Sequence, residues 1–289
     1  MISTLDYVVW NADPAIFSLG PLTVRWYGLM FAVGFFIGYQ IVARMFKHEG
    51  APESWLGVLL IYLVAGTVVG ARLGHVFFYQ WDYYSQHPGE ILKIWEGGLA
   101  SHGGTIGNII ALLLFSWLVS KKPASWVFDK IVVAVALVAG LIRLGNLMNS
   151  EIYGGPTDLP WGFIFVRDGA TLPMHPTQLY EAGCYFVLFA LLMWMYWKRN
   201  AEERPWLLTG VFFVWTFGTR FLIEYVKNVQ VSSEYAMIEK YGMNLGQMLS
   251  IPFILLGITL VITACVRPRQ HWTFPNAFPK ENQDTYRKK

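Results

Sequence analysis

The sequence is poor in charged residues and in cysteine. Only 14% of its 289 residues are charged, whereas a soluble domain usually carries about 25%. Most of the chain therefore has little contact with water. The basic residues are scattered and the net charge is only +3, so we expect no nucleic-acid partner. The two cysteines, Cys184 and Cys265, lie inside apolar runs, a pattern of small buried side chains that offers no disulfide framework.

Signals for metals, cofactors and export are also absent from the sequence. No HExxH or CxxC spacing occurs, so we expect neither a metal site nor a cofactor. The first residues, MISTLDYVVWNADP, contain no basic segment and no small-residue cleavage site. We therefore expect no cleavable signal peptide.

What the sequence has instead is a series of apolar runs of about 20 residues, the length that a helix needs to cross a bilayer. These runs predict an all-α, polytopic membrane protein with seven transmembrane helices. The predicted spans are residues 22–43, 55–79, 99–119, 125–148, 176–197, 206–226 and 245–266.

Basic residues predict the orientation of the spans, because connections rich in lysine and arginine stay in the cytoplasm. Every second connection is basic, with Arg44 and Lys47, then Lys121 and Lys122, then Lys198, Arg199 and Arg204, and finally Arg267 and Arg269. The N-terminus is therefore predicted to lie outside and the C-terminus in the cytoplasm. We expect residues 1–267 to form a single integral-membrane domain and residues 268–289 a polar cytoplasmic tail.

Polar side chains collect at the outer end of every predicted span. They are Arg25 and Tyr27; Arg72 and His75; His102; Arg143, Asn146 and Asn149; Gln178, Tyr180 and Glu181; Arg220 and Glu224; and Asn244 and Gln247. Random snorkelling would decorate both ends of a span alike. We therefore infer an outward-facing polar cavity within the bundle.

The segment IRLGNLMNSEIYG, residues 142–154, carries the most informative of these side chains. Arg143 ends an apolar run, where an unpaired cation costs at least a few kcal/mol. Arginine grips phosphate with two parallel hydrogen bonds, so the predicted ligand is an anionic phospholipid headgroup. Structural pairings also fit: Arg220 with Glu224 one turn later, and Arg72 with Glu96.

His102 is flanked by glycines in WEGGLASHGGTIG. Glycine lets backbone or substrate approach closely, and an imidazole can accept a proton near neutral pH. We therefore interpret His102 as a catalytic or substrate-contacting residue, whereas His75 and His175 fit hydrogen-bonded structural roles better.

Six motifs occur along the chain: WYGLM (26–30), GARLGHVFFY (70–79), WEGGLASHGGTIG (95–107), IRLGNLMNSEIYG (142–154), HPTQLYE (175–181) and R-x3-E (220–224). In this order they resemble the motifs of the bacterial prolipoprotein diacylglyceryl transferases. The resemblance implies a seven-span enzyme of the bacterial inner membrane with its active site facing the periplasm. It also implies that residues 1–267 are the catalytic domain.

That family moves the sn-1,2-diacylglyceryl group of phosphatidylglycerol onto the lipobox cysteine thiol of a prolipoprotein signal peptide. The step releases glycerol phosphate and begins lipoprotein maturation. The resemblance implies these partners for this chain, within membrane lipids, and no cofactor. It implies catalysis by His102, Arg143 and Arg220, and substrate binding by Arg143, Tyr27, Asn146, Glu151, Gly154 and Glu224.

Three positions depart from the family pattern. Ile142 stands where the family usually has glycine, Leu147 where it usually has phenylalanine, and Thr216 where it often has tyrosine. Extra bulk at Ile142 should change the packing beside Arg143 without removing its charge. The role of a phenol at position 216 is either lost or taken by another residue.

The charges predict a nucleophilic substitution. A thiol, with an ordinary pKa of about 8.5, attacks well only as the thiolate. His102 is the candidate base, and the field of the arginines is the alternative way to deprotonate the thiol. Arg143 and Arg220 would hold the leaving phosphate, and Asn146 and Tyr27 would orient the headgroup.

Two other classes of protein share parts of this pattern. A small-anion transporter would use the same arginines, but it needs polar residues through the cytoplasmic halves of the spans, which are almost bare of them. A membrane scaffold that binds signal peptides without chemistry is the other. Release of glycerol phosphate, coupled to a mass gain on a lipobox peptide, separates the enzyme from both.

Overall fold

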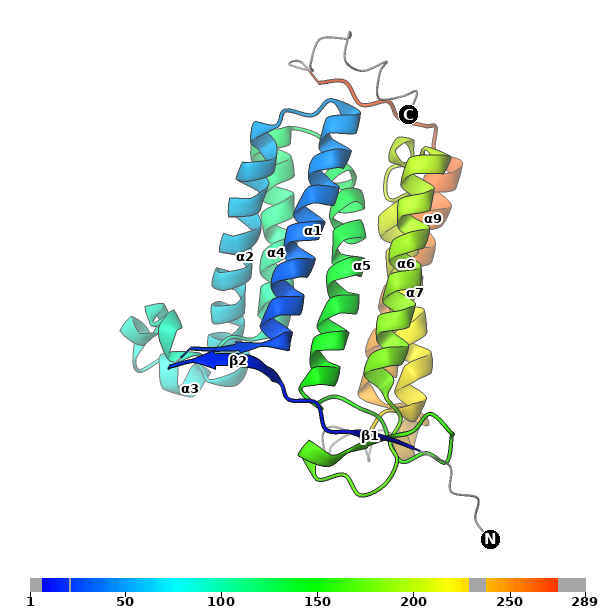
Figure 1. The fold of residues 1–289 in the computed structure, drawn as a ribbon. Coiled ribbons are helices and arrows are strands. Elements are labelled where there is room, and N and C mark those ends of the chain that lie inside the picture. Colours follow the sequence, from blue (N-terminus) through cyan, green and yellow to red (C-terminus); the bar gives the residue numbers. More distant parts are fainter. Residues whose placement is uncertain (1–6, 21, 229–237, 275–289) are drawn as a thin grey trace. The chain divides into compact units, whose positions relative to one another are not determined.

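The computed structural model describes residues 7–20, 22–228 and 238–274 (Figure 1). Within these ranges seven helices are long and apolar enough to cross a membrane, as the sequence predicts, and they make the chain a multi-pass membrane protein. They are α1 (Trp26–Glu49), α2 (Ser54–Tyr79), α4 (Ser101–Leu114) continued by η3 (Phe115–Ser120), α5 (Ala124–Met148), α6 (Thr177–Arg199), α7 (Leu207–Ile223) continued by η6 (Glu224–Val226), and α9 (Leu245–Val266).

The largest difference from the predicted spans is at the first one. Its expected beginning forms the strand β3 (Leu22–Arg25), which pairs antiparallel with β2 (Ala15–Leu19). The β-branched residues Thr23 and Val24 suit a strand. Arg25, predicted at the start of a helix, therefore ends a strand. A second pair, β1 (Val8–Trp10) with β4 (Phe163–Phe165), is parallel.

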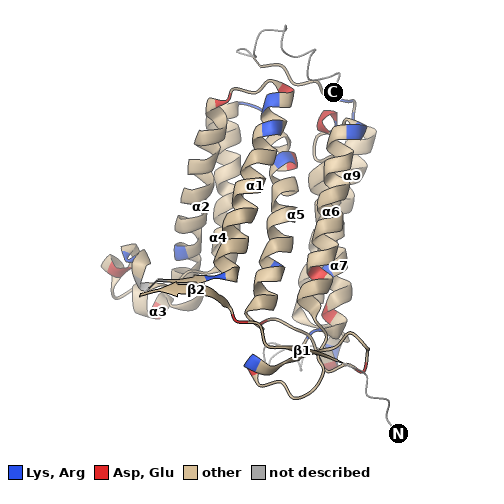
Figure 2. Cartoon of the chain, viewed as in Figure 1, with Lys and Arg blue, Asp and Glu red and all other residues tan. Residues whose placement is uncertain are grey.

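The chain divides into two compact units. The first comprises Met1–Ile41 and Asp129–Gln270, and the second comprises Val42–Phe128 and His271–Lys289. In each unit the charged residues gather near helix ends and are sparse along the middle of the helices (Figure 2). This distribution is expected where the middle of a helix faces hydrocarbon.

A buried carboxylate in the first unit holds the start of α7. Asp129, on α5, accepts hydrogen bonds from the backbone N–H groups of Trp206 (2.7 Å) and Thr209 (2.8 Å) and from the Thr209 hydroxyl (2.7 Å). These donors belong to the first turn of α7, whose N–H groups have no partner within the helix. Further along, Trp215 Nε1 donates to the carbonyl of Cys184 (2.9 Å), which ties α7 to α6.

Glycine contacts join α2 and α4 in the second unit. A Cβ on Gly66 would lie 2.6 Å from the carbonyl oxygen of Gly107, and one on Gly70 would lie 2.7 Å from Gly107 Cα. The glycine steps read from the sequence are thus the face where two helix backbones meet, as small residues allow in membranes.

The C-terminal segment belongs to the second unit. Phe274 is buried against Trp55 and Trp126, with ring centroids 5.8 and 5.6 Å away. Most of the predicted polar tail, residues 275–289, lies outside the described residues.

Candidate functional site

The turn that follows α5 is strained and is held by neighbouring segments. Ser150 and Ile152 adopt the left-handed region, with φ of 55° and 62°, which is unfavourable for a β-branched residue. The hydroxyl of Thr177 donates to the carbonyl of Ile152 (3.0 Å), and Gln178 Nε2 donates to that of Glu151 (2.8 Å). The start of α6 therefore fixes the turn in a conformation that its sequence disfavours.

Arg143 projects from α5 into a polar network. Its Nε lies 2.7 Å from Glu181 Oε2 on α6, and its Nη1 donates to Asn146 Oδ1 (3.2 Å). Asn146 donates to Glu151 Oε1 (2.8 Å), which also accepts from Asn149 (3.1 Å). One carboxylate thus sets the side of Arg143, and two amides orient a second carboxylate beside it.

A series of ion pairs continues from Glu181. Lys227 Nζ lies 2.6 Å from Glu181 Oε1 and 3.5 Å from Glu224 Oε1, and Arg220 Nε lies 3.5 Å from the same Glu224 oxygen. Figure 2 marks acidic and basic residues together on α6 and α7. The series Arg143–Glu181–Lys227–Glu224–Arg220 therefore alternates in sign and joins the two predicted arginines. We call it the ion-pair series.

The ends of the ion-pair series differ from its middle in exposure. The side chain of Arg143 is 23% exposed and that of Arg220 is 44% exposed, whereas Glu181, Lys227 and Glu224 are 5%, 7% and 11% exposed. The carboxylates and the lysine are thus hidden, while the two guanidinium groups remain accessible. Such an arrangement can receive an anion between two cations.

Gly154 brings the backbone that carries Lys227 against the rest of the site. Its N–H donates to the carbonyl of His175 (2.8 Å), its carbonyl accepts from Asn228 Nδ2 (3.1 Å), and it forms an antiparallel bridge with Lys227. A Cβ at Gly154 would collide with the carbonyl oxygen of Val226. Burial lowers the pKa of the His175 imidazole below its usual value, which suits the structural role expected for it.

Two tyrosines lie beside Arg143. A Cβ on Gly145 would lie 2.9 Å from the ring of Tyr27, so this glycine of α5 makes room for the tyrosine of α1. Tyr185, on α6, hydrogen-bonds Arg143 and interacts electrostatically with Arg220. Its phenol is therefore available where Thr216 supplies none, and the Thr216 hydroxyl has no hydrogen-bond partner among the described residues.

Comparison with known proteins gives a consistent result. The sequence model of a family described as prolipoprotein diacylglyceryl transferase matches residues 14–263, most of the chain. The chain belongs to the prolipoprotein diacylglyceryl transferase family. The resemblance drawn from the motifs is thus confirmed, and the protein is a transferase.

Relatives named phosphatidylglycerol–prolipoprotein diacylglyceryl transferase match this member of the family along nearly their whole length. The one from Porphyromonas gingivalis is 49% identical over 91% of this chain and 96% of its own. The one from Chloroherpeton thalassium is 46% identical, over 90% and 95%. The one from Tolumonas auensis is 47% identical, over 88% and 96%.

Most of the residues predicted for the transferase site meet in the first unit. The ion-pair series contains Arg143, Arg220 and Glu224, and the contacts described above add Tyr27, Asn146, Glu151 and Gly154. The i,i+4 pairing of Arg220 with Glu224, weighed as a structural alternative, does form, and it leaves the arginine part-exposed. The sequence analysis assigned no role to Lys227. Its spacing of three from Glu224 was the available signal.

His102 and Arg72 of the transferase belong to the second unit. His102 is exposed in the first turn of α4. Arg72 is buried and donates to the carbonyls of Glu90 (2.7 Å), Ile91 (2.8 Å) and Gly97 (2.7 Å). Its guanidinium thus organises the segment that precedes α4, through backbone carbonyls.

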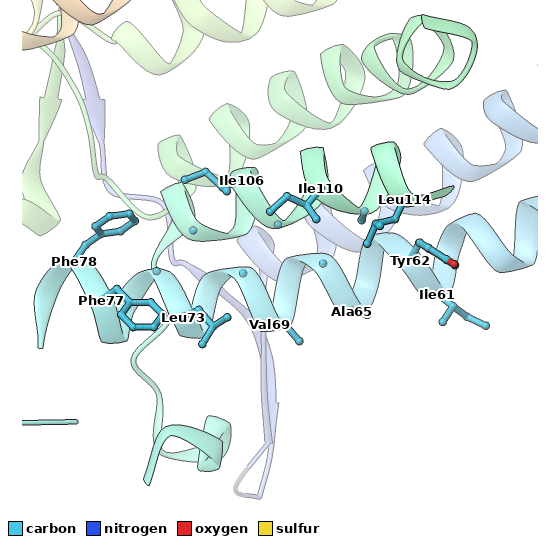
Figure 3. Close-up of a pocket in the computed structure, with 16 residues that line it drawn as sticks. Ile61, Tyr62, Ala65, Val69, Leu73, Phe77, Phe78, Ile106, Ile110 and Leu114 are labelled. Carbon is cyan, nitrogen blue, oxygen red and sulfur yellow. The ribbon is translucent and has the colours of Figure 1, made fainter. Parts of the chain in front are cut away.

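The second unit also carries an apolar groove of about 580 Å³ along α2 and α4 (Figure 3). Figure 3 shows Leu73 and Phe77 of α2 and Ile106 and Ile110 of α4 beside it. None of its lining residues is charged. The groove therefore suits hydrocarbon and offers no grip for a phosphate, in contrast to the ion-pair series.

Proposed function

We propose that this chain transfers the sn-1,2-diacylglyceryl group of phosphatidylglycerol to the lipobox cysteine thiol of a prolipoprotein, the first step of lipoprotein maturation. Family membership and the names of the relatives support this activity. The observation that carries it is the pairing of Arg143 and Arg220 at the two exposed ends of one ion-pair series. Two neighbouring guanidinium groups suit the phosphate that must leave.

The proposed reaction is a displacement at the glycerol carbon that bears the phosphate ester. The cysteine sulfur forms a bond to this carbon while the carbon–oxygen bond to phosphate breaks. The bonding electrons leave with the oxygen, and glycerol phosphate is released. Arg143 and Arg220 attract the leaving group more strongly as its negative charge grows, so their hold favours the transition state.

Activation of the thiol is the second requirement. Its proton must leave before or during attack, because the thiol itself is a weak nucleophile. We assign His102 as the base, and the positive field of the arginines is the alternative. Tyr27, Asn146, Glu151 and Gly154 are assigned to binding of the headgroup, together with Glu224 as the partner of Arg220.

The proposal includes a location. Residues 1–267 form the catalytic domain in the bacterial inner membrane, with the N-terminus outside, the polar cavity facing the periplasm and residues 268–289 as a cytoplasmic tail. The alternation of basic connections supports this orientation. Both substrates are membrane-resident, so each can reach the site within the bilayer.

The test is a coupled assay on the purified protein with phosphatidylglycerol and a synthetic lipobox peptide. We expect release of glycerol phosphate together with a peptide mass gain equal to one diacylglyceryl group. Lipid or peptide binding without either product would favour a scaffold, and phosphate flux into vesicles would favour a transporter.

Variants assign the roles. Arg143→Ala should abolish transfer while the protein still accumulates folded in membranes. Arg167→Ala is the matched control, because this exposed arginine pairs with Asp13 (3.1 Å) outside the site. Full activity of the first variant would remove the phosphate grip from the mechanism. His102→Gln should be severely impaired, and near-normal turnover would leave the arginine field as the means of activation.

A further inference from the structure

Lys227 is a buried lysine to which the mechanism above gives no role. It follows η6 at the end of α7, and only 7% of its side chain is exposed. Burying an ammonium group is costly unless it is paired. Its Nζ meets Glu181 at 2.6 Å and Glu224 at 3.5 Å, so a single lysine joins two carboxylates that lie on α6 and at the end of α7.

Each of these carboxylates also contacts an arginine, and in each case through Nε. Glu181 uses Oε2 for Arg143 (2.7 Å) and Oε1 for Lys227. Glu224 uses Oε1 for Arg220 (3.5 Å), and its Oε2 accepts from Asn244 (3.2 Å). Contact through Nε leaves the terminal guanidinium nitrogens, which form the two-pronged grip on phosphate, on the other side of the group.

We infer that Lys227 is a positioning residue that holds both carboxylates away from the phosphate-binding ends of the arginines. Without Lys227, Oε1 of Glu181 loses its partner, and a carboxylate with a vacant oxygen can rotate to take two nitrogens of Arg143. That pairing would occupy the donors that the lipid phosphate needs. The inference rests on the proposed function, because it assumes a phosphate ligand.

The backbone around Lys227 supports a positioning role. Gly155 N–H donates to the carbonyl of Val226 (2.9 Å), and Gly154 is bridged to Lys227. The lysine is therefore fixed by a short ladder to the turn that also carries Glu151. Its side chain has a defined origin, which a loosely held surface lysine lacks.

The test compares Lys227→Met, Lys227→Arg and Lys93→Met in the coupled assay. For Lys227→Met we expect the apparent KM for phosphatidylglycerol to rise about tenfold or more, with kcat at saturating lipid changed by less than about threefold. Lys227→Arg keeps the charge and should restore most of the KM. Lys93→Met is the matched control, because Lys93 also pairs with a glutamate three residues earlier (Glu90, 3.2 Å) but is 37% exposed.

A binding measurement separates this inference from the proposed function. Phosphatidylglycerol should raise the unfolding temperature of the purified protein more than phosphatidylcholine does, and Lys227→Met should lose most of that difference. If the unmodified protein bound phosphatidylglycerol but transferred nothing, the proposed function would fail, while the loss of lipid stabilisation in Lys227→Met would still support the inference.

Two results would overturn the inference. One is an unchanged KM and unchanged lipid stabilisation in Lys227→Met, and the other is a fall in kcat with KM unaffected. If Lys227→Met does not accumulate, the double variant Lys227→Met/Glu224→Gln removes one charge of each sign and replaces it in the assay. The same rise in KM is expected there, and a KM equal to that of the unmodified protein would refute the role.

Discussion

Replacing Gly154 with alanine should disrupt the site through backbone packing alone. The added Cβ would collide with the Val226 carbonyl oxygen and lie 2.8 Å from Thr177 Cγ2 and 2.9 Å from His175 Cβ. These atoms belong to the backbone or to the base of short side chains, so none can swing away. The segment that carries Val226 and Lys227 must therefore move.

The cost follows from two contributions. Forcing an extra methyl group into a packed site costs about 1–3 kcal/mol. Weakening the hydrogen bond from Gly155 to Val226, now 2.9 Å, costs about 1 kcal/mol more. We therefore expect a loss of about 2–4 kcal/mol in stability. Because Lys227 is displaced from Glu181, transfer should fall by about 100-fold, as misplacement by about 1 Å can cause.

Gly155→Ala provides the control at the next residue. A Cβ there would lie 3.4 Å from Asn228 Oδ1 and 3.9 Å from the Val226 carbonyl oxygen, which are ordinary contacts. The assay is diacylglyceryl transfer to a lipobox peptide, alongside thermal unfolding in the same detergent. The reasoning is refuted if the two alanine variants have equal activities and equal unfolding temperatures.

Two further predictions concern side chains that hold backbone. Arg72→Lys keeps the charge but cannot span the carbonyls that Arg72 now binds, so we expect faster proteolysis of residues 88–98 and lower transfer; an unchanged cleavage rate would contradict this. Asp129→Asn exchanges an acceptor oxygen for a donor at the start of α7, where Trp206 and Thr209 need acceptors. The thermal midpoint should fall by an amount that corresponds to about 1–3 kcal/mol, and a midpoint equal to that of the unmodified protein would show that the cap is dispensable.

Much of the fold was predictable because a bilayer sets a simple requirement. A helix that crosses it must be apolar over a fixed length, and that signal is local in the sequence. The spans α2, α5, α6 and α9 accordingly begin and end close to the predicted residues. The start of α1 was wrong because Leu22–Arg25 is also apolar enough for a span, and only its pairing with β2 shows that it is a strand.

The sequence by itself determined the class of protein, the number of spans, the family and the residue types of the site, since these depend on composition and on motifs of adjacent residues. Only the tertiary structure decided that Glu181 and Lys227 connect Arg143 to Arg220, that Arg72 binds backbone carbonyls, and that Gly154 must lack a Cβ. Each of these features is a contact between segments far apart in the chain, and helix spacing does not encode which side chains meet across neighbouring helices.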